Sequence, residues 1–191
     1  NCIGIGTEGN LFRYDSKSAQ ISTINYIKNN SVKSLVLDED GMLLAGTDNG
    51  LYVYDAERNQ IQHVAHDSRN TYSLSNNIVW TIFRDKEDNI WLGTDYNISL
   101  ARNNKLFRSV PISEITGVGE GNRFHAIYRD SKKRFWLGGT NGLIQKETIE
   151  NKNAVRWFRM GNPQYSISHN RIRQIYEDKD NNIWLRSEER R

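Results

Sequence analysis

Ile90-Trp91-Leu92-Gly93-Thr94 is the stretch that decides the fold, because five versions of it occur along the chain. The other four are Ile3-Gly4-Ile5-Gly6-Thr7, Leu43-Leu44-Ala45-Gly46-Thr47, Phe135-Trp136-Leu137-Gly138-Gly139-Thr140 and Ile183-Trp184-Leu185-Arg186-Ser187. Neighbouring versions lie 40 to 48 residues apart. Recurrence of β-type sequence at this period is typical of a β-propeller, in which each repeat forms one four-stranded blade.

The residues around this stretch alternate in polarity, as strands do, and turn residues separate the alternating segments. In the third repeat the pattern predicts strands at 79–84, 90–94, 98–102 and 105–110. We therefore expect an all-β protein of antiparallel four-stranded blades, about four in number, that form one partial β-propeller over 1–191. The predicted blades are 1–29, 30–76, 77–121, 122–169 and an incomplete 170–191.

Composition excludes several classes of protein. The 191 residues include 26 basic and 23 acidic side chains that are interspersed, so no basic cluster of the kind that binds nucleic acid is present. The mean hydropathy is −0.74, and no stretch is apolar enough to span a bilayer, so we expect no membrane contact by this fragment. The one cysteine, Cys2, rules out an internal disulfide and a cysteine-based metal cluster.

Aligning the repeats places equivalent residues in columns. An aspartate follows each first strand: Asp38, Asp85, Asp130 and Asp178. The loops that follow are too short to supply the ligands of a calcium site, so we expect turns there and no metal. An asparagine stands eight residues before each aspartate: Asn30, Asn77, Asn122 and Asn170. We expect Asx turns at these positions, with a ligand-contacting rim as the alternative. The tryptophan column, Trp91, Trp136 and Trp184, is expected to be buried core.

One column does not repeat. Five residues before the aspartates stand Lys33, Trp80, His125 and Arg173. Packing between blades would favour similar residues at equivalent positions, so this variation in size and charge indicates a surface that faces a ligand. A solvated rim is the alternative. Because the first strand of a propeller blade is usually innermost, we expect these four residues to form a ligand-binding site, bordered by the loops 67–77 and 161–170.

The sequence offers little support for catalysis. His63 and His66 lie three residues apart on a predicted strand, so they point to opposite faces and cannot hold one metal together. No serine lies in a nucleophile elbow, and no glycine-rich phosphate loop precedes a helix. We therefore expect no catalytic residue, metal or cofactor. A carboxylate pair for glycoside cleavage stays open, because such pairs come from distant loops.

The repeat resembles a known family, the two-component regulator propeller repeat. The resemblance rests on Tyr72-Ser73-Leu74-Ser75-Asn76-Asn77-Ile78-Val79-Trp80-Thr81-Ile82-Phe83-Arg84-Asp85 followed by Asn89-Ile90-Trp91-Leu92-Gly93-Thr94, and on the same pattern in 165–185. The sequence departs from the family pattern at Asn97-Ile98, where glycine-leucine is usual, at Gly138-Gly139, with an extra glycine, and at Arg186-Ser187, where glycine-threonine is expected.

The resemblance implies a seven-bladed periplasmic propeller in the sensor region of a hybrid two-component histidine kinase. Such an inner-membrane receptor detects glycan fragments and switches on polysaccharide-utilisation genes. The implied partners are an oligosaccharide, further propeller blades and the signalling domains of the parent chain. The family carries no fixed catalytic motif, so we expect this fragment to be no enzyme. The alternatives are a protein-binding scaffold and a carbohydrate-active propeller enzyme.

Four blades are fewer than the seven that the family builds. The strands predicted at 3–7 and 183–187 would leave unpaired backbone groups at sheet edges, which invite pairing. We expect the chain either to form a homodimer through these edges or to be part of a longer propeller. The alternative is a closed four-bladed ring in which 172–177 completes the first blade.

Overall fold

The computed structural model describes residues 2–38, 40–102, 107–116, 122–149 and 155–188, which form five antiparallel sheets in chain order. We number these sheets as blades 1 to 5. Blade 1 holds β1 (Cys2–Gly6), β2 (Leu11–Asp15) and β3 (Gln20–Ile24). Blade 2 holds β4 (Val32–Leu37), β5 (Leu43–Thr47), β6 (Gly50–Asp55) and β7 (Gln60–Val64). Blade 3 holds β8 (Val79–Arg84), β9 (Ile90–Thr94), β10 (Ile98–Ala101) and β11 (Phe107–Val110). Blade 4 holds β12 (Phe124–Arg129), β13 (Phe135–Gly139), β14 (Gly142–Lys146) and β15 (Arg156–Phe158), and blade 5 holds β16 (Ile172–Glu177) and β17 (Ile183–Ser187).

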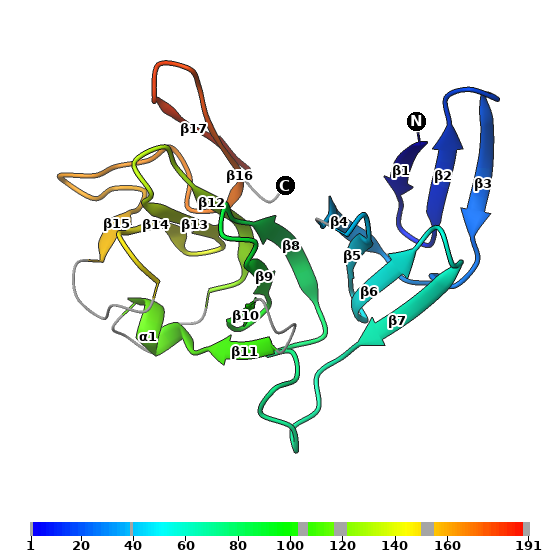
Figure 1. Cartoon of the computed structure of the whole chain (residues 1–191). Coiled ribbons are helices and arrows are strands. Elements are labelled where there is room, and N and C mark those ends of the chain that lie inside the picture. Colours follow the sequence, from blue (N-terminus) through cyan, green and yellow to red (C-terminus); the bar gives the residue numbers. More distant parts are fainter. Residues whose placement is uncertain (1, 39, 103–106, 117–121, 150–154, 189–191) are drawn as a thin grey trace.

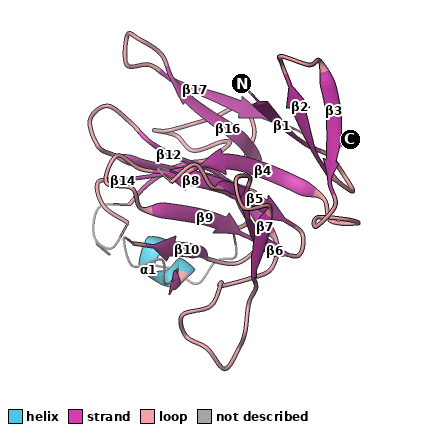
Figure 2. Cartoon of the chain, turned by 45° about the vertical axis from the view of Figure 1, so that its right-hand side comes forward, coloured by secondary structure: helices cyan, strands magenta, loops and turns pink. Residues whose placement is uncertain are grey.

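The prediction of an all-β protein with four-stranded antiparallel blades is confirmed. The one helix among the described residues is the short α1 (Ile112–Thr116), which stands out as the only helical segment in Figure 2. No helix in this part of the chain is long and apolar enough to cross a membrane.

The blades follow one another in an open arc (Figure 1). The first strands of successive blades contact each other, β4 with β8, β8 with β12 and β12 with β16. In blade 5, β16 pairs with β17, and in blade 1, β1 pairs with β2. Strand β16 therefore does not complete blade 1, and the chain does not adopt the alternative four-bladed ring.

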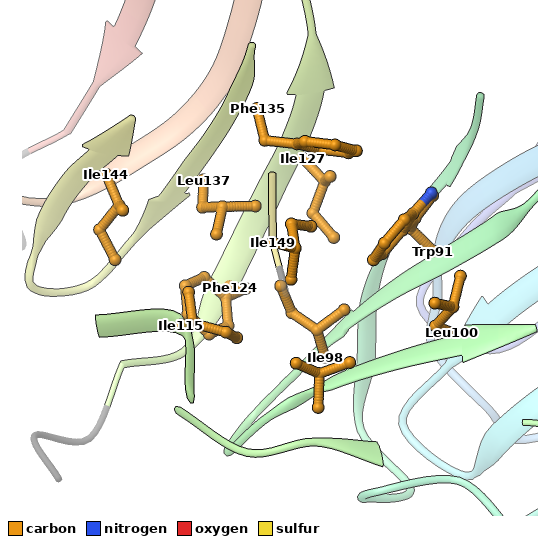
Figure 3. Close-up of a cluster of buried hydrophobic side chains, with 11 residues drawn as sticks. Trp91, Ile98, Leu100, Ile115, Phe124, Ile127, Phe135, Leu137, Ile144 and Ile149 are labelled. Atoms are coloured by element: carbon orange, nitrogen blue, oxygen red, sulfur yellow. The ribbon is translucent and has the colours of Figure 1, made fainter. Parts of the chain in front are cut away.

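The core lies between neighbouring blades. The largest cluster joins blades 3 and 4, where Trp91 and Ile98 face Ile127 and Phe135 (Figure 3). The rings of Trp91 and Phe135 lie 5.1 Å apart between centroids. Each blade thus buries one face against the next, which is how a repeat architecture builds a continuous core.

The tryptophan column is buried in two of its three positions. Trp91 is 5% exposed and Trp136 is 7% exposed, as predicted. Trp184 is 62% exposed, so the prediction of a buried core residue is wrong there. The reason is that Trp184 belongs to the two-stranded blade 5, where no further described strand covers it.

Asp85, Asp130 and Asp178 each accept hydrogen bonds from a backbone N–H of the following turn and from a tryptophan indole. Asp130 Oδ1 accepts the backbone N–H of Arg134 at 2.8 Å, and its Oδ2 accepts the indole N–H of Trp136 at 2.8 Å. Burial alone would raise the pKa of Asp130, but these hydrogen bonds hold it below its ordinary value. Asp85 and Asp178 bind Trp91 and Trp184 in the same way. These carboxylates therefore serve the turn and the core.

The asparagine column does not make the predicted Asx turns in the described residues. Asn77 Oδ1 instead accepts the N–H of His66 at 2.6 Å, which ties blade 3 to the segment after the last strand of blade 2. Asn170 reaches back to blade 4 in the same manner. The local turn bond is made one residue earlier, where Asn76 Oδ1 accepts the N–H of Ile78 at 2.8 Å. Asn77 and Asn170 thus link successive blades, whereas Asn30 and Asn122 form hydrogen bonds within blades 2 and 4.

The glycine of the repeated stretch sets the distance between blades. A Cβ placed on Gly93 would lie 2.6 Å from the carbonyl oxygen of Phe124 in blade 4. A Cβ on Gly138 would lie 2.6 Å from Cγ2 of Ile172 in blade 5. Only glycine allows the first strand of the next blade to approach this closely.

The sequence suggested that Gly139 is an extra glycine in the repeat, but Gly139 instead replaces the threonine of the repeated stretch. It pairs with Gly142 across the β13–β14 hairpin, as Thr47 pairs with Gly50 in blade 2. Gly139 therefore occupies the threonine position. The side chain of Asn122 fills the space that a Cβ would need there.

Candidate ligand-binding site

A β-bulge occurs at the same place in the first strand of blades 2 to 5. In blade 2, Val32 pairs with Thr47 and Ser34 pairs with Gly46, which leaves Lys33 without a cross-strand partner. The same interruption in the other blades leaves out Trp80, His125 and Arg173. A bulged residue is excluded from the ladder, and the bulge can turn its side chain in a new direction. The four residues of the divergent column are therefore the four bulged residues.

The structure brings all four together. They line one open concavity of about 720 Å³ along the first strands of blades 2 to 5. Ser34, Thr81 and Gln174, which follow the bulges, also line it. No residue of the loops 67–77 and 161–170 lines this concavity. Part of the first loop instead folds back on itself through a hydrogen bond between His66 Nδ1 and the carbonyl of Leu74, at 2.6 Å.

The four bulged residues form a continuous row. Lys33 Nζ lies 4.5 Å from the centre of the Trp80 ring, a cation–π contact. The rings of Trp80 and His125 meet edge to face with centroids 4.7 Å apart. His125 Nδ1 lies 3.4 Å from Nη1 of Arg173. Each blade thus contributes one side chain that touches the side chain of the next.

Acidic residues that the sequence analysis did not single out hold the row in place. The indole N–H of Trp80 donates to Asp95 in the β9–β10 turn, and Asp95 also pairs with Arg123 at 3.4 Å. Glu188 accepts from Arg173 Nε at 3.2 Å and from Arg186 at 2.8 Å. No signal in the repeat pattern marks these carboxylates, because they lie outside the aligned first strands.

His125 is a neutral, buried imidazole. The residue is 9% exposed. Burial, followed by the charges of Arg173 and Arg171, lowers the pKa of His125 to about 4, against a smaller raising effect of Asp95. Since a guanidinium can only donate, Nδ1 accepts and the hydrogen sits on Nε2. Nε2 is buried and has no hydrogen-bond partner in the described part of the chain.

We expect His125 to make folding sensitive to acid. Unfolded histidine takes up a proton as the pH falls through about 6.5, whereas folded His125 stays neutral down to pH about 4. The unfolded state binds more protons in this window, so the free energy of unfolding falls as the pH falls. His125→Gln should show a smaller loss of stability between pH 7 and pH 5 in urea unfolding. An equal loss in both proteins would contradict the assignment.

The repeated fold and the row of bulged residues define a β-propeller-type repeat protein with a concavity along its innermost strands. The two-component regulator propeller family matches residues 73–96 and 166–189. The chain therefore carries two-component regulator propeller repeats, as its sequence predicted. Over 184 residues the chain is 27% identical to Histidine kinase P4 of Formosa agariphila. The aligned region covers 91% of this chain and 12% of that protein.

Solved structures share the fold of this chain. The extracellular domain of a protein assigned to a hybrid two component system of B. thetaiotaomicron is 53% identical, with a TM-score of 0.51 over 97% of this chain and 25% of that one. A second such domain from the same organism, 20% identical over 97% of this chain and 24% of that one, shares the fold with a TM-score of 0.75. Virginiamycin B lyase of Staphylococcus aureus shares only the fold, with a TM-score of 0.66. It is 12% identical, and the match covers 94% of this chain and 57% of that one. The chain thus spans about a quarter of the extracellular domains that it matches.

Proposed function

We propose that this chain is part of the ligand-sensing propeller of a hybrid two-component histidine kinase, in the periplasm as part of an inner-membrane receptor. It detects oligosaccharides and thereby regulates polysaccharide-utilisation genes. The fragment itself is non-catalytic, and its parent chain supplies the kinase. The proposal rests on the likeness to extracellular domains of two-component systems and on the chemistry of the concavity.

One observation carries the proposal. The bulged residues differ in charge and size while their neighbours repeat, and they converge on one concavity. Trp80 offers a half-buried aromatic ring whose N–H is bound to Asp95, and a sugar that stacks its C–H groups on this ring would meet Lys33 beside it. Lys33 lies against this ring, Arg173 lies at the other end of the row beyond His125, and both cations suit acidic substituents of a sugar.

The position of the site also suits signalling. The four bulged residues come from four different blades, so a ligand that contacts all of them would favour one relative placement of these blades. A ligand shifts a conformational equilibrium only through such differential contacts. Binding along the first strands would therefore change the propeller on which the rest of the receptor depends.

The test is the double variant Trp80→Ala, Arg173→Gln in the full-length receptor. We expect it to lose the transcriptional response to the activating oligosaccharide and the thermal shift which that sugar gives the extracellular region. The matched control is Tyr96→Ala, Arg69→Gln, which changes an exposed aromatic residue and an exposed arginine outside the concavity. An unchanged response in the first variant would reject the site. Turnover of the sugar by the receptor region would point to an enzyme instead.

A further inference from the structure

Blade 2 lacks the tryptophan of blades 3, 4 and 5. Leu44 occupies its place, since Leu44 pairs with Val53 across the β5–β6 hairpin as Trp91 pairs with Leu100 across β9–β10. The backbone therefore presents this position toward the next blade in both cases. The smaller side chain leaves space that the tryptophan fills elsewhere.

A pocket of about 360 Å³ lies at this place between blades 2 and 3. Leu44 and Val53 line it from blade 2, and Ile90 and Phe107 line it from blade 3. In the next interface the corresponding space holds the Trp91 ring, which packs on Phe135, the counterpart of Ile90. Val53 and Ile90 are only partly buried, so the pocket is open to solvent.

One end of the pocket carries a carboxylate that could accept the N–H of an indole ring. Asp38 lines it and is the counterpart of Asp85 and Asp130, whose Oδ2 atoms accept an indole N–H at 2.8 Å. Asp38 Oδ1 accepts the backbone N–H of Met42 at 2.8 Å, so the turn is formed as in the other blades. No hydrogen bond to Asp38 Oδ2 occurs within the described residues.

We propose that this pocket binds a small planar aromatic molecule of the indole class, whose ring fills the space in front of Leu44 and whose N–H donates to Asp38. Blades 3 and 4 show the same arrangement made from their own tryptophans, and that arrangement defines the ligand. Leu44, Leu51, Val53, Ile90 and Phe107 supply apolar contacts for the ring, and polar residues, among them Gln60, Gln62 and Arg102, line the rest of the pocket. Among the described residues, the pocket has no lining residue in common with the concavity of the bulged residues, so this inference does not depend on the proposed function.

Calorimetric titration of the intact chain with indole and with 1-methylindole tests the inference. The methyl group removes the N–H and leaves the ring. We expect indole to bind about tenfold more tightly, because a hydrogen bond to a carboxylate contributes about that factor. Equal affinities, or no binding of indole, would overturn the proposal.

Leu44→Trp is the matched variant. It supplies the ring from the chain itself, so we expect a higher melting temperature and loss of indole binding in a folded protein. Retained binding of indole would place the ligand elsewhere. Unfolding of the variant would also count against the proposal, because the pocket would then be unable to accept an indole ring.

Discussion

Trp136→Ala is expected to lower the free energy of unfolding by about 3–5 kcal/mol, the usual cost of truncating a buried tryptophan. Trp136 is 7% exposed and packs with Leu143 and with Ile172 of the next blade. Its removal leaves a cavity at the interface between blades 4 and 5. It also takes away the indole N–H that Asp130 accepts at 2.8 Å. Urea unfolding followed by far-ultraviolet circular dichroism measures the loss.

Trp184→Ala is the control for this prediction. Trp184 makes the same hydrogen bond, to Asp178 at 2.7 Å, but it is 62% exposed. Its truncation should therefore cost about 1 kcal/mol or less, in the range of surface substitutions. If both variants lost the same stability, burial between blades would not be what makes Trp136 important.

The fold could be predicted because its determinants recur at a fixed spacing. The glycine of the repeated stretch must be glycine wherever another first strand packs on it, as at Gly93 and Gly138. The tryptophan recurs at the position that faces the next blade, where Trp91 packs on Phe135. These are contacts between successive repeats, and they leave a periodic trace in the sequence.

Other contacts leave no such trace. Asn77 accepts a hydrogen bond from the N–H of His66, which follows the last strand of the preceding blade. Local turn propensity predicted a partner within the turn of Asn77 itself and was therefore wrong. The exposure of Trp184 depends on which strands cover blade 5, which its own repeat does not encode. The helix α1 ends against the buried Lys146, whose Nζ donates to the carbonyl of Ile115 at 2.8 Å. The helix occurs once among the described residues, between blades 3 and 4, so this contact leaves no periodic signal.

The candidate site was predictable for a physical reason. A residue in a bulge has no cross-strand partner, and so it is released from the cross-strand pairing that other columns share. The variation from Lys33 to Trp80 to His125 therefore reports a backbone feature that the sequence shows only indirectly. The residues that fix the row, Asp95 and Glu188, escaped because each acts once, in a turn or beyond the last strand.

Gly93→Val is expected to cost about 3 kcal/mol, near the upper end for forcing extra carbon atoms into a packed interface. A Cβ at this position would lie 2.6 Å from the carbonyl oxygen of Phe124 and 2.6 Å from Cγ2 of Thr81. The threonine side chain can rotate, but the carbonyl belongs to strand β12. Blade 4 must therefore move away from blade 3 to admit the new side chain, and urea unfolding should report the lost packing.

Gly9→Ala is the matched control, because a Cβ on Gly9 meets nothing within 4 Å and should leave stability within a few tenths of a kcal/mol of the parent, or slightly above it. The two glycines also differ in their effect on the site. Phe124 precedes His125, whose ring lies 4.7 Å from that of Trp80. Strand β12 cannot retreat from Gly93 without carrying His125 away from Trp80. Under the proposed function, Gly93→Val should therefore also weaken the receptor's response to its oligosaccharide. A destabilised variant with a full response would show that blade packing does not control the row of bulged residues.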